Sequence, residues 1–233
     1  MFSGGYMIYI VITLAFSGIG MVVSNRLKSK FRHYSQVPMS NGKSGEEIAL
    51  EMLRHFNISD VKVTQGQGFL TDHYNPLSKT VTLSPEVFQG RSVAAAAVAA
   101  HECGHAVQHA NAYVWLKVRS AIVPVVQVAS KAQSILLMFA LGALGAGFGQ
   151  TILLITILVF AVTTAVSLIT LPVEFDASNR ALAWLNTSRY AAGREYDGAK
   201  DALWWAAMTY VVSALSSLAI LIFLVMRYLG ARD

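Results

Sequence analysis

Long stretches without a charged residue are the feature that most constrains the fold of this chain. Residues 1–23, 151–171 and 203–226 contain no aspartate, glutamate, lysine or arginine, and residues 121–148 contain only Lys131. About 20 apolar residues in a helix cross the roughly 30 Å hydrocarbon core of a bilayer. Only 13% of the chain is charged, against roughly 25% in a soluble domain. The sequence therefore predicts a mainly α-helical membrane protein with about four transmembrane helices.

These runs divide the chain into alternating apolar and polar segments. We predict a first transmembrane helix at 1–25, an α+β region at 26–119, a transmembrane hairpin at 120–171, a polar helical segment at 172–202, a last transmembrane helix at 203–228 and a tail at 229–233. The uncharged residues around Gly147 are expected to form the turn of the hairpin.

Basic residues set the expected orientation of these helices. Arg26, Lys28, Lys30 and Arg32 directly follow the first apolar run, whereas a signal peptide carries its charges before that run. Because cytoplasmic flanks are rich in lysine and arginine, we expect the N-terminus outside and both polar segments in the cytoplasm. Arg227 and Arg232 run against this rule. The net charge of +5 is thus explained by topology, and no basic patch interleaved with aromatics suggests nucleic-acid binding.

The region 26–119 carries signals of short helices and strands. Ser44 and Glu47 form a capping-box pattern that predicts a helix start. Residues 61–64, 69–76 and 80–84 are expected to form strands, with Asn75-Pro76 as a turn. Ser84 followed by proline predicts a short helix, and Ser92 is expected to cap an alanine-rich helix.

That last helix carries the motif His101-Glu102-Cys103-Gly104-His105. Histidines four positions apart lie on one helix face, where both imidazoles can bind one zinc ion. Glu102 is then placed to take a proton from the water that the metal activates and to return it to a leaving amine. Cys103 lies on another face, so we expect a small packed residue rather than a ligand.

A catalytic zinc needs a third protein ligand and an open position. His109 shares the helix face of His101 but lies about 12 Å along the axis from it, too far for a straight helix to converge on one ion. Glu174 is the better candidate, because Pro172 is expected to start a new helix directly after an apolar run. An acidic residue there is costly unless paired. The alternative is an acidic residue favoured by the dipole at a helix start.

Four segments together resemble the YugP-like neutral zinc metallopeptidases, which are bacterial membrane proteins; the segments are 68–76, 83–88, 99–108 and 172–181. The resemblance runs in the same order over most of the chain. It implies a gluzincin-like zinc-peptidase region on the cytoplasmic side of the bacterial inner membrane. It also implies His101 and His105 as zinc ligands, Glu102 as general base and Glu174 as third ligand. The layout is similar to that of HtpX-like and CAAX-prenyl proteases.

The resemblance also implies roles for residues around the metal. Related proteases carry a Glu-x-x-x-Asp pattern, whereas this chain has Ser178 at the fourth place after Glu174 and Asp176 at the second. Ser178 is expected to orient His105 or Glu174, and Asp176 to partner a ligand histidine. We expect His109 to be a surface or supporting residue.

Gluzincins also pair an exposed strand with extended substrate. By analogy, three residues would present backbone groups to the peptide: Leu70, Thr71 and Asp72. His73 or Tyr74 would reach the developing oxyanion, and the alternative is that both fill a turn. Arg194 and Tyr196 are weaker oxyanion candidates.

These observations predict a zinc-dependent peptidase with the lipid bilayer as its surroundings. The resemblance implies that its substrates are membrane-proximal polypeptides. Cleavage inside the membrane is disfavoured, because residues 92–100 are too short and too weakly apolar to bring His101 to mid-bilayer. The alternative of another class is a non-catalytic zinc-binding membrane adaptor or scaffold. Glu102 argues against it, since a structural zinc site needs no base. No sequence feature identifies an oligomer or a partner subunit.

Overall fold

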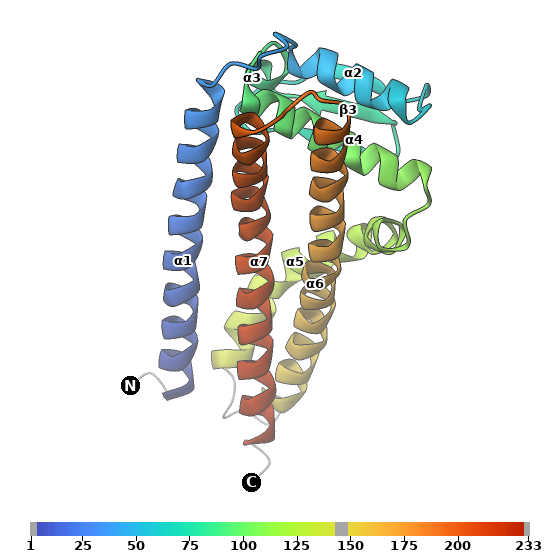
Figure 1. The fold of residues 1–233 in the computed structure, drawn as a ribbon. Coiled ribbons are helices and arrows are strands. Elements are labelled where there is room, and N and C mark those ends of the chain that lie inside the picture. Colours follow the sequence, from blue (N-terminus) through green and yellow to red (C-terminus); the bar gives the residue numbers. More distant parts are fainter. Residues whose placement is uncertain (1–3, 143–148, 231–233) are drawn as a thin grey trace. The chain divides into compact units, whose positions relative to one another are not determined.

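The computed structural model describes residues 4–142 and 149–230, and it is mostly helical with one small sheet (Figure 1). The elements in chain order are α1 (Gly4–Ser35), α2 (Gly45–His55), β1 (Lys62–Gln65), β2 (His73–Asn75), β3 (Thr80–Leu83), α3 (Pro85–Phe88), α4 (Val93–Ala110), α5 (Val114–Gly142), α6 (Gly149–Thr187) and α7 (Arg194–Leu229). The turn predicted around Gly147 lies outside the described residues.

Within the described part of the chain, three helices are long and apolar enough to span a membrane. They are α6, α7 and the part of α1 from Tyr6 to Ser35. A fourth candidate is the pair formed by α4 and α5, which passes the same test only jointly and is bent by 96°. The prediction of about four transmembrane helices is therefore supported as three to four candidates.

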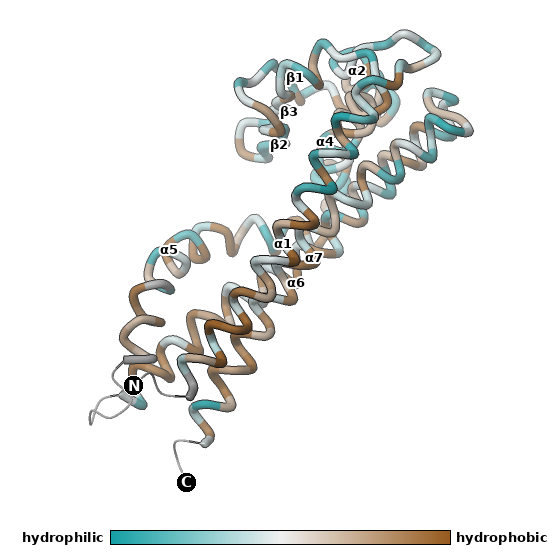
Figure 2. Tube along the Cα trace, turned by 90° about the vertical axis from the view of Figure 1, so that its left-hand side faces the viewer, coloured by the Kyte–Doolittle hydropathy of each residue, from teal (hydrophilic) through white to brown (hydrophobic). Residues whose placement is uncertain are grey.

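The chain forms two compact units, which we describe separately. The span unit comprises Met1–Val22, Val118–Leu171 and Thr209–Asp233. The site unit comprises Val23–Lys117 and Pro172–Met208. In the span unit, Phe160, Leu153 and Leu224 are buried in a small core, whereas many large apolar side chains point outward. Hydrophobic colouring dominates these helical stretches in Figure 2. A largely apolar exterior of this kind suits contact with lipid.

The core of the site unit lies where α2 packs along α4 (Figure 1). Ile48 and Met52 of α2 are fully buried there, as are most of the alanines of α4. Alanine gives α4 high helix propensity and a thin surface that neighbouring elements can approach closely. The predicted caps are confirmed: the Ser44 hydroxyl accepts from Glu47 N in a capping box, and the Ser92 side chain accepts from Ala95 N.

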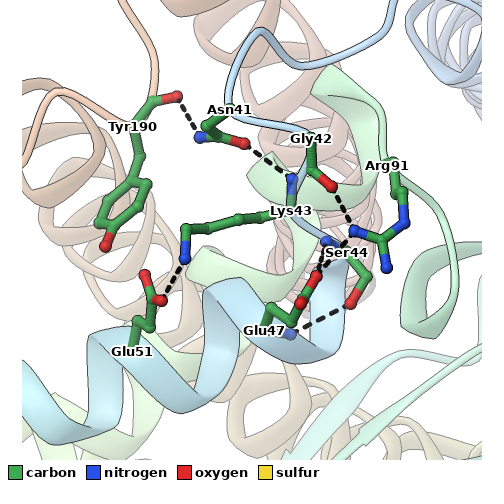
Figure 3. A network of polar contacts seen from close by, with 8 residues as sticks. All are labelled: Asn41, Gly42, Lys43, Ser44, Glu47, Glu51, Arg91 and Tyr190. Atoms are coloured by element: carbon green, nitrogen blue, oxygen red, sulfur yellow. Dashed lines mark hydrogen bonds and ion pairs between the residues drawn. The ribbon is translucent and has the colours of Figure 1, made fainter.

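A polar network fastens the segment before α2 to the rest of this unit (Figure 3). The Asn41 side chain donates to Tyr190 O at 3.0 Å and accepts from Lys43 N at 2.9 Å. The Lys43 ammonium pairs with Glu51. Arg91 bonds Gly42 O and lies 2.9 Å from the Glu47 carboxylate. This network ties the start of α2 to the residues around α3 and to the turn that follows α6.

The sheet has the strand order β1-β3-β2, with β1 parallel and β2 antiparallel to β3. The Asn75 side chain accepts from Leu77 N and Ser78 N, as expected for a turn at Asn75-Pro76. The first and third predicted strands are confirmed. The strand predicted for 69–76 is wrong over its first half, because β2 begins only at His73 and Leu70 has a φ of 56°. A left-handed φ of this kind is incompatible with an extended strand.

The prediction that Pro172 starts a new helix is also wrong. Pro172 lies inside α6, which continues without a break to Thr187. A proline within a helix costs about 3 kcal/mol because its ring displaces the preceding carbonyl and it lacks an N–H. The turn after Pro172 is strongly buried, with Val173, Glu174 and Ala177 each at most 2% exposed. This burial offsets the cost of the proline and keeps the helix continuous.

Candidate metal centre

The first part of the site comes from α4 alone. Ser92 caps the helix, and its alanine-rich first half sets its position against α2 and α3. His101 and His105 then follow on one face, with ring centroids 4.8 Å apart and the ring planes at 81°. A helix of this kind therefore holds two imidazoles side by side through their spacing.

The second part comes from α6, which approaches α4 at Gly104. A Cβ added at Gly104 would lie 2.5 Å from Ala177 O and 3.2 Å from Ala177 Cα. No larger residue fits this contact without moving one helix. The glycine inside the motif thus permits the close approach that brings Glu174 to the histidines.

Glu174 meets both histidines and is 2% exposed. Its Oε2 lies 3.3 Å from His101 Nε2 and 3.6 Å from His105 Nε2. One ligand atom from each of the three residues lies within 4.8 Å of the others. Among the described residues this is the one such cluster of histidine, cysteine and acidic side chains. Neither His109 nor Cys103 belongs to it.

The chemistry of this donor set fits zinc. The Nδ1 atoms of both rings are engaged elsewhere, His101 Nδ1 with Ser178 Oγ at 3.1 Å and His105 Nδ1 with Gln108 Oε1 at 2.9 Å. Both Nε2 atoms are therefore turned toward Glu174. Two imidazole nitrogens and one carboxylate oxygen are a usual protein ligand set of a catalytic zinc, with a position left for water or substrate.

Glu102 is buried beside these ligands. Burial raises the pKa of its carboxyl, the neighbouring imidazoles of His101 and His105 lower it, and the charges of Glu174 and Asp72 raise it further. A raised pKa makes a carboxylate a stronger base near neutral pH. Glu102 thus has the environment that a general base requires.

Cys103 occupies the other side of α4. It is fully buried, its thiol donates to Ala49 O at 3.5 Å, and burial raises its pKa. A buried, protonated thiol is a packing residue, which confirms the prediction for this side chain.

Asp72 does not lie in a strand. Its carboxylate accepts from Ser84 N at 2.7 Å and from Ser84 Oγ, and burial raises its pKa. Asp72 thereby fixes the start of α3 rather than presenting its backbone in an extended conformation. Thr71 donates its hydroxyl to Gln67 O, which closes a turn in the segment that was predicted as a strand.

The two oxyanion candidates on β2 have different surroundings. The Tyr74 hydroxyl lies 2.8 Å from His109 Nδ1, and burial raises the pKa of Tyr74 to about 12. Tyr74 and His109 both line a cleft of about 320 Å³ beside the end of α4. The exposed His73 uses its Nδ1–H to bond Thr71 O at 2.8 Å. On α7, Arg194 is exposed and Tyr196 packs against the core of the site unit.

The residues expected to support the two histidines and Glu174 make contacts that differ from the predicted ones. Ser178 contacts His101, although we predicted His105 or Glu174. Asp176 reaches the site through Gln108, whose Nε2 donates to Asp176 Oδ2 at 2.8 Å. Gln108 was not among the predicted site residues. Its position three residues after His105 places it on the same helix face, which is the signal that would have identified it.

A family model described as "Putative neutral zinc metallopeptidase" matches residues 6–229. The chain is 40% identical over 230 residues to "Putative membrane protease YugP" of Bacillus subtilis (strain 168), which covers 97% of this chain and 99% of the relative. No solved structure matches the chain. The alternative of a non-catalytic adaptor is not favoured by these matches. The chain belongs to the family of neutral zinc metallopeptidases.

Proposed function

We propose that this protein is a membrane-bound zinc peptidase whose metal is held by His101, His105 and Glu174. The observation that carries the proposal is the convergence of their three ligand atoms within 4.8 Å. Glu174 joins this cluster from a distant part of the chain at 2% exposure. A buried carboxylate is costly unless cations or metal ligation compensate it, so a metal explains its placement.

The residues around the cluster supply the proton transfers. Zinc bound there supplies a Lewis acid that polarises the scissile carbonyl and lowers the pKa of the attacking water. Glu102 takes the proton of that water and returns it to the leaving amine, so that one carboxyl group serves as base and then as acid. Its burial raises its pKa, which favours uptake of the proton from the water.

Tyr74 is the oxyanion donor that we propose, because it lies on the strand that contacts α4 and its phenol hydroxyl can donate a hydrogen bond. With a pKa of about 12 its phenol stays protonated at neutral pH. When His109 donates its Nδ1–H to the phenol oxygen, the phenol O–H is left to donate to the substrate.

The substrate we propose is an extended polypeptide close to the membrane. Among the described strands, β2 pairs with β3 on one side only. Its other edge is therefore available for an extended peptide. This edge comprises His73–Asn75 and replaces Leu70, Thr71 and Asp72 as the proposed pairing segment. The basic residues after the first apolar run support a cytoplasmic site in the bacterial inner membrane.

The test uses the detergent-solubilised full chain. We expect about one zinc ion per protein, peptidase activity on an unfolded reporter such as labelled casein, loss of activity with a chelator and recovery on adding zinc. Glu102→Gln should keep its zinc and lose about 1000-fold in kcat. Glu86→Gln, at an exposed acid on α3, is the matched control and should be unchanged. Wild-type cleavage rates in the Glu102→Gln protein would exclude the mechanism.

A further inference from the structure

Gln108 is a fully buried amide that touches three other groups in the site unit. Its Oε1 lies 2.9 Å from His105 Nδ1. Its Nε2 donates to Val173 O at 2.7 Å and to Asp176 Oδ2 at 2.8 Å. Both ends of the amide are therefore engaged, one end with His105 and the other end with α6.

These contacts determine which way the amide points. A backbone carbonyl and a carboxylate can only accept hydrogen bonds, so the end of the amide that faces Val173 and Asp176 must be the NH2 group. The carbonyl oxygen then faces His105, and His105 Nδ1 must carry the hydrogen. In a neutral imidazole this leaves the lone pair at Nε2, on the side of Glu174.

Asp176 is fixed in turn by Arg180. Arg180 Nε donates to Asp176 Oδ2 at 2.6 Å, and the guanidinium lies 5.8 Å from the centroid of the Tyr113 ring. The Tyr113 hydroxyl donates to Pro172 O at 3.5 Å. The orientation of His105 is thus linked through Gln108 to a charged pair on the surface of α6.

We propose that Gln108 is a positioning residue, which holds His105 as the Nδ1–H tautomer so that Nε2 faces the metal. This inference rests on the proposed zinc site. His101 lacks an equivalent constraint, because the Ser178 hydroxyl can donate or accept and therefore does not select a tautomer. Gln108 contacts His105 and never the substrate, so it acts through the ligand.

The test compares zinc affinity, measured by competition with a chromogenic chelator, with the absorption spectrum of the cobalt-substituted protein. Gln108→Met keeps the volume and removes both hydrogen-bonding functions. We expect zinc affinity to fall about 10-fold to 100-fold and the cobalt spectrum to shift. Gln108→Glu keeps an acceptor for His105 and should stay within about fivefold of the wild type, since a buried carboxyl beside Asp176 is protonated and resembles the amide.

Two further variants separate positioning from packing. Val107→Ala removes buried volume from α4 away from the ligands and should lower the thermal midpoint of the metal-free protein without changing zinc affinity. Asp176 is partly buried, so leucine can be accommodated there. Asp176→Leu should weaken zinc binding about threefold to tenfold, because the Gln108 amide loses its hydrogen bond to the carboxylate. It keeps the proposal testable if Gln108→Met does not fold.

The outcomes are distinct. If the wild type binds zinc and Gln108→Met has the same affinity and cobalt spectrum, the positioning role is wrong while the zinc site stands. The same holds if Gln108→Glu is as weak as Gln108→Met, or if Val107→Ala loses affinity in proportion to its thermal midpoint. A wild-type chain that binds no zinc would instead overturn the proposed function itself, and the role of Gln108 with it.

Discussion

The two helices that build the site, α4 and α6, supply their residues in opposite ways. In α4, the two proposed histidine ligands and the proposed base lie within the five residues 101–105, so helical spacing alone brings them together. In α6, Glu174 reaches those ligands because Gly104 lets the backbone of Ala177 come close. A local motif therefore positions one side of the site, whereas helix packing positions the other. Substitutions in α4 and substitutions in α6 should therefore have different effects on zinc binding and on stability.

The largest effect is expected on α6. Glu174→Gln removes the anionic ligand while α4 keeps both histidines, so zinc affinity should fall more than 100-fold and kcat by more than about 1000-fold at limiting zinc. Chelator competition and casein cleavage measure the two losses. Glu86→Gln controls for loss of an acidic side chain. Wild-type affinity in Glu174→Gln would mean that α4 alone holds the metal.

The second largest effect is expected for Tyr74 on β2, which belongs to neither helix. Tyr74→Phe should lower kcat about 100-fold and leave zinc affinity unchanged, because the phenol is assigned to the oxyanion rather than to the metal. Tyr34→Phe is the matched control, since the Tyr34 hydroxyl donates to Asp201 at 2.7 Å and is assigned no part in the reaction. Equal rates for Tyr74→Phe and wild type would remove Tyr74 from the mechanism.

The contact between the helices is tested at Gly104. Gly104→Ala places a methyl group against Ala177 O, so the helices must separate at a cost of about 1–3 kcal/mol in unfolding free energy. Zinc affinity should fall about 10-fold or more as Glu174 withdraws. Gly18→Ala on α1, where nothing lies within 4 Å of an added Cβ, should leave zinc affinity unchanged. A stable Gly104→Ala protein with full affinity would show that close packing of α6 is not required.

The smallest effect concerns Ser178. Ser178→Ala removes the hydroxyl that contacts His101 Nδ1, and zinc affinity should fall about threefold to tenfold. The loss should be smaller than that of Gln108→Met, because the hydroxyl does not select a tautomer of His101. A larger loss of zinc affinity in Ser178→Ala than in Gln108→Met would mean that His101, and not His105, depends more on its hydrogen-bond partner. Thermal unfolding of the metal-free variants checks that neither change acts through stability.

The same contrast explains what the sequence could predict. Caps at Ser44 and Ser92 and the short helix after Ser84 depend on neighbouring residues, and the structure has them where they were predicted. Among the described residues, three apolar runs lie in helices that could span a membrane, whereas α5 passes that test only together with α4. Pro172 and the segment around Leu70 were misread. Burial against α4 overrides the local preference of the proline, and turn contacts such as that of Thr71 replace strand pairing.

The site residues show the same contrast between local pattern and helix packing. His101 and His105 form a local pattern, and Glu174 was nominated from its place after an apolar run, although the new helix expected at Pro172 does not exist. Gln108 was missed because its role depends on Val173 and Asp176, which lie 65 and 68 residues away in sequence. Partners of this kind become visible only once α4 and α6 are packed together.

X-ray absorption at the zinc K edge of the purified, zinc-loaded protein tests the central claim most directly. Two imidazole ligands from α4 and oxygen ligands that include Glu174 are predicted, with no sulfur scatterer, because Cys103 is packed away from the cluster. Replacing Glu174 by glutamine should change the oxygen contribution and leave both imidazoles. A sulfur ligand, or a third imidazole from His109, would contradict the proposed centre.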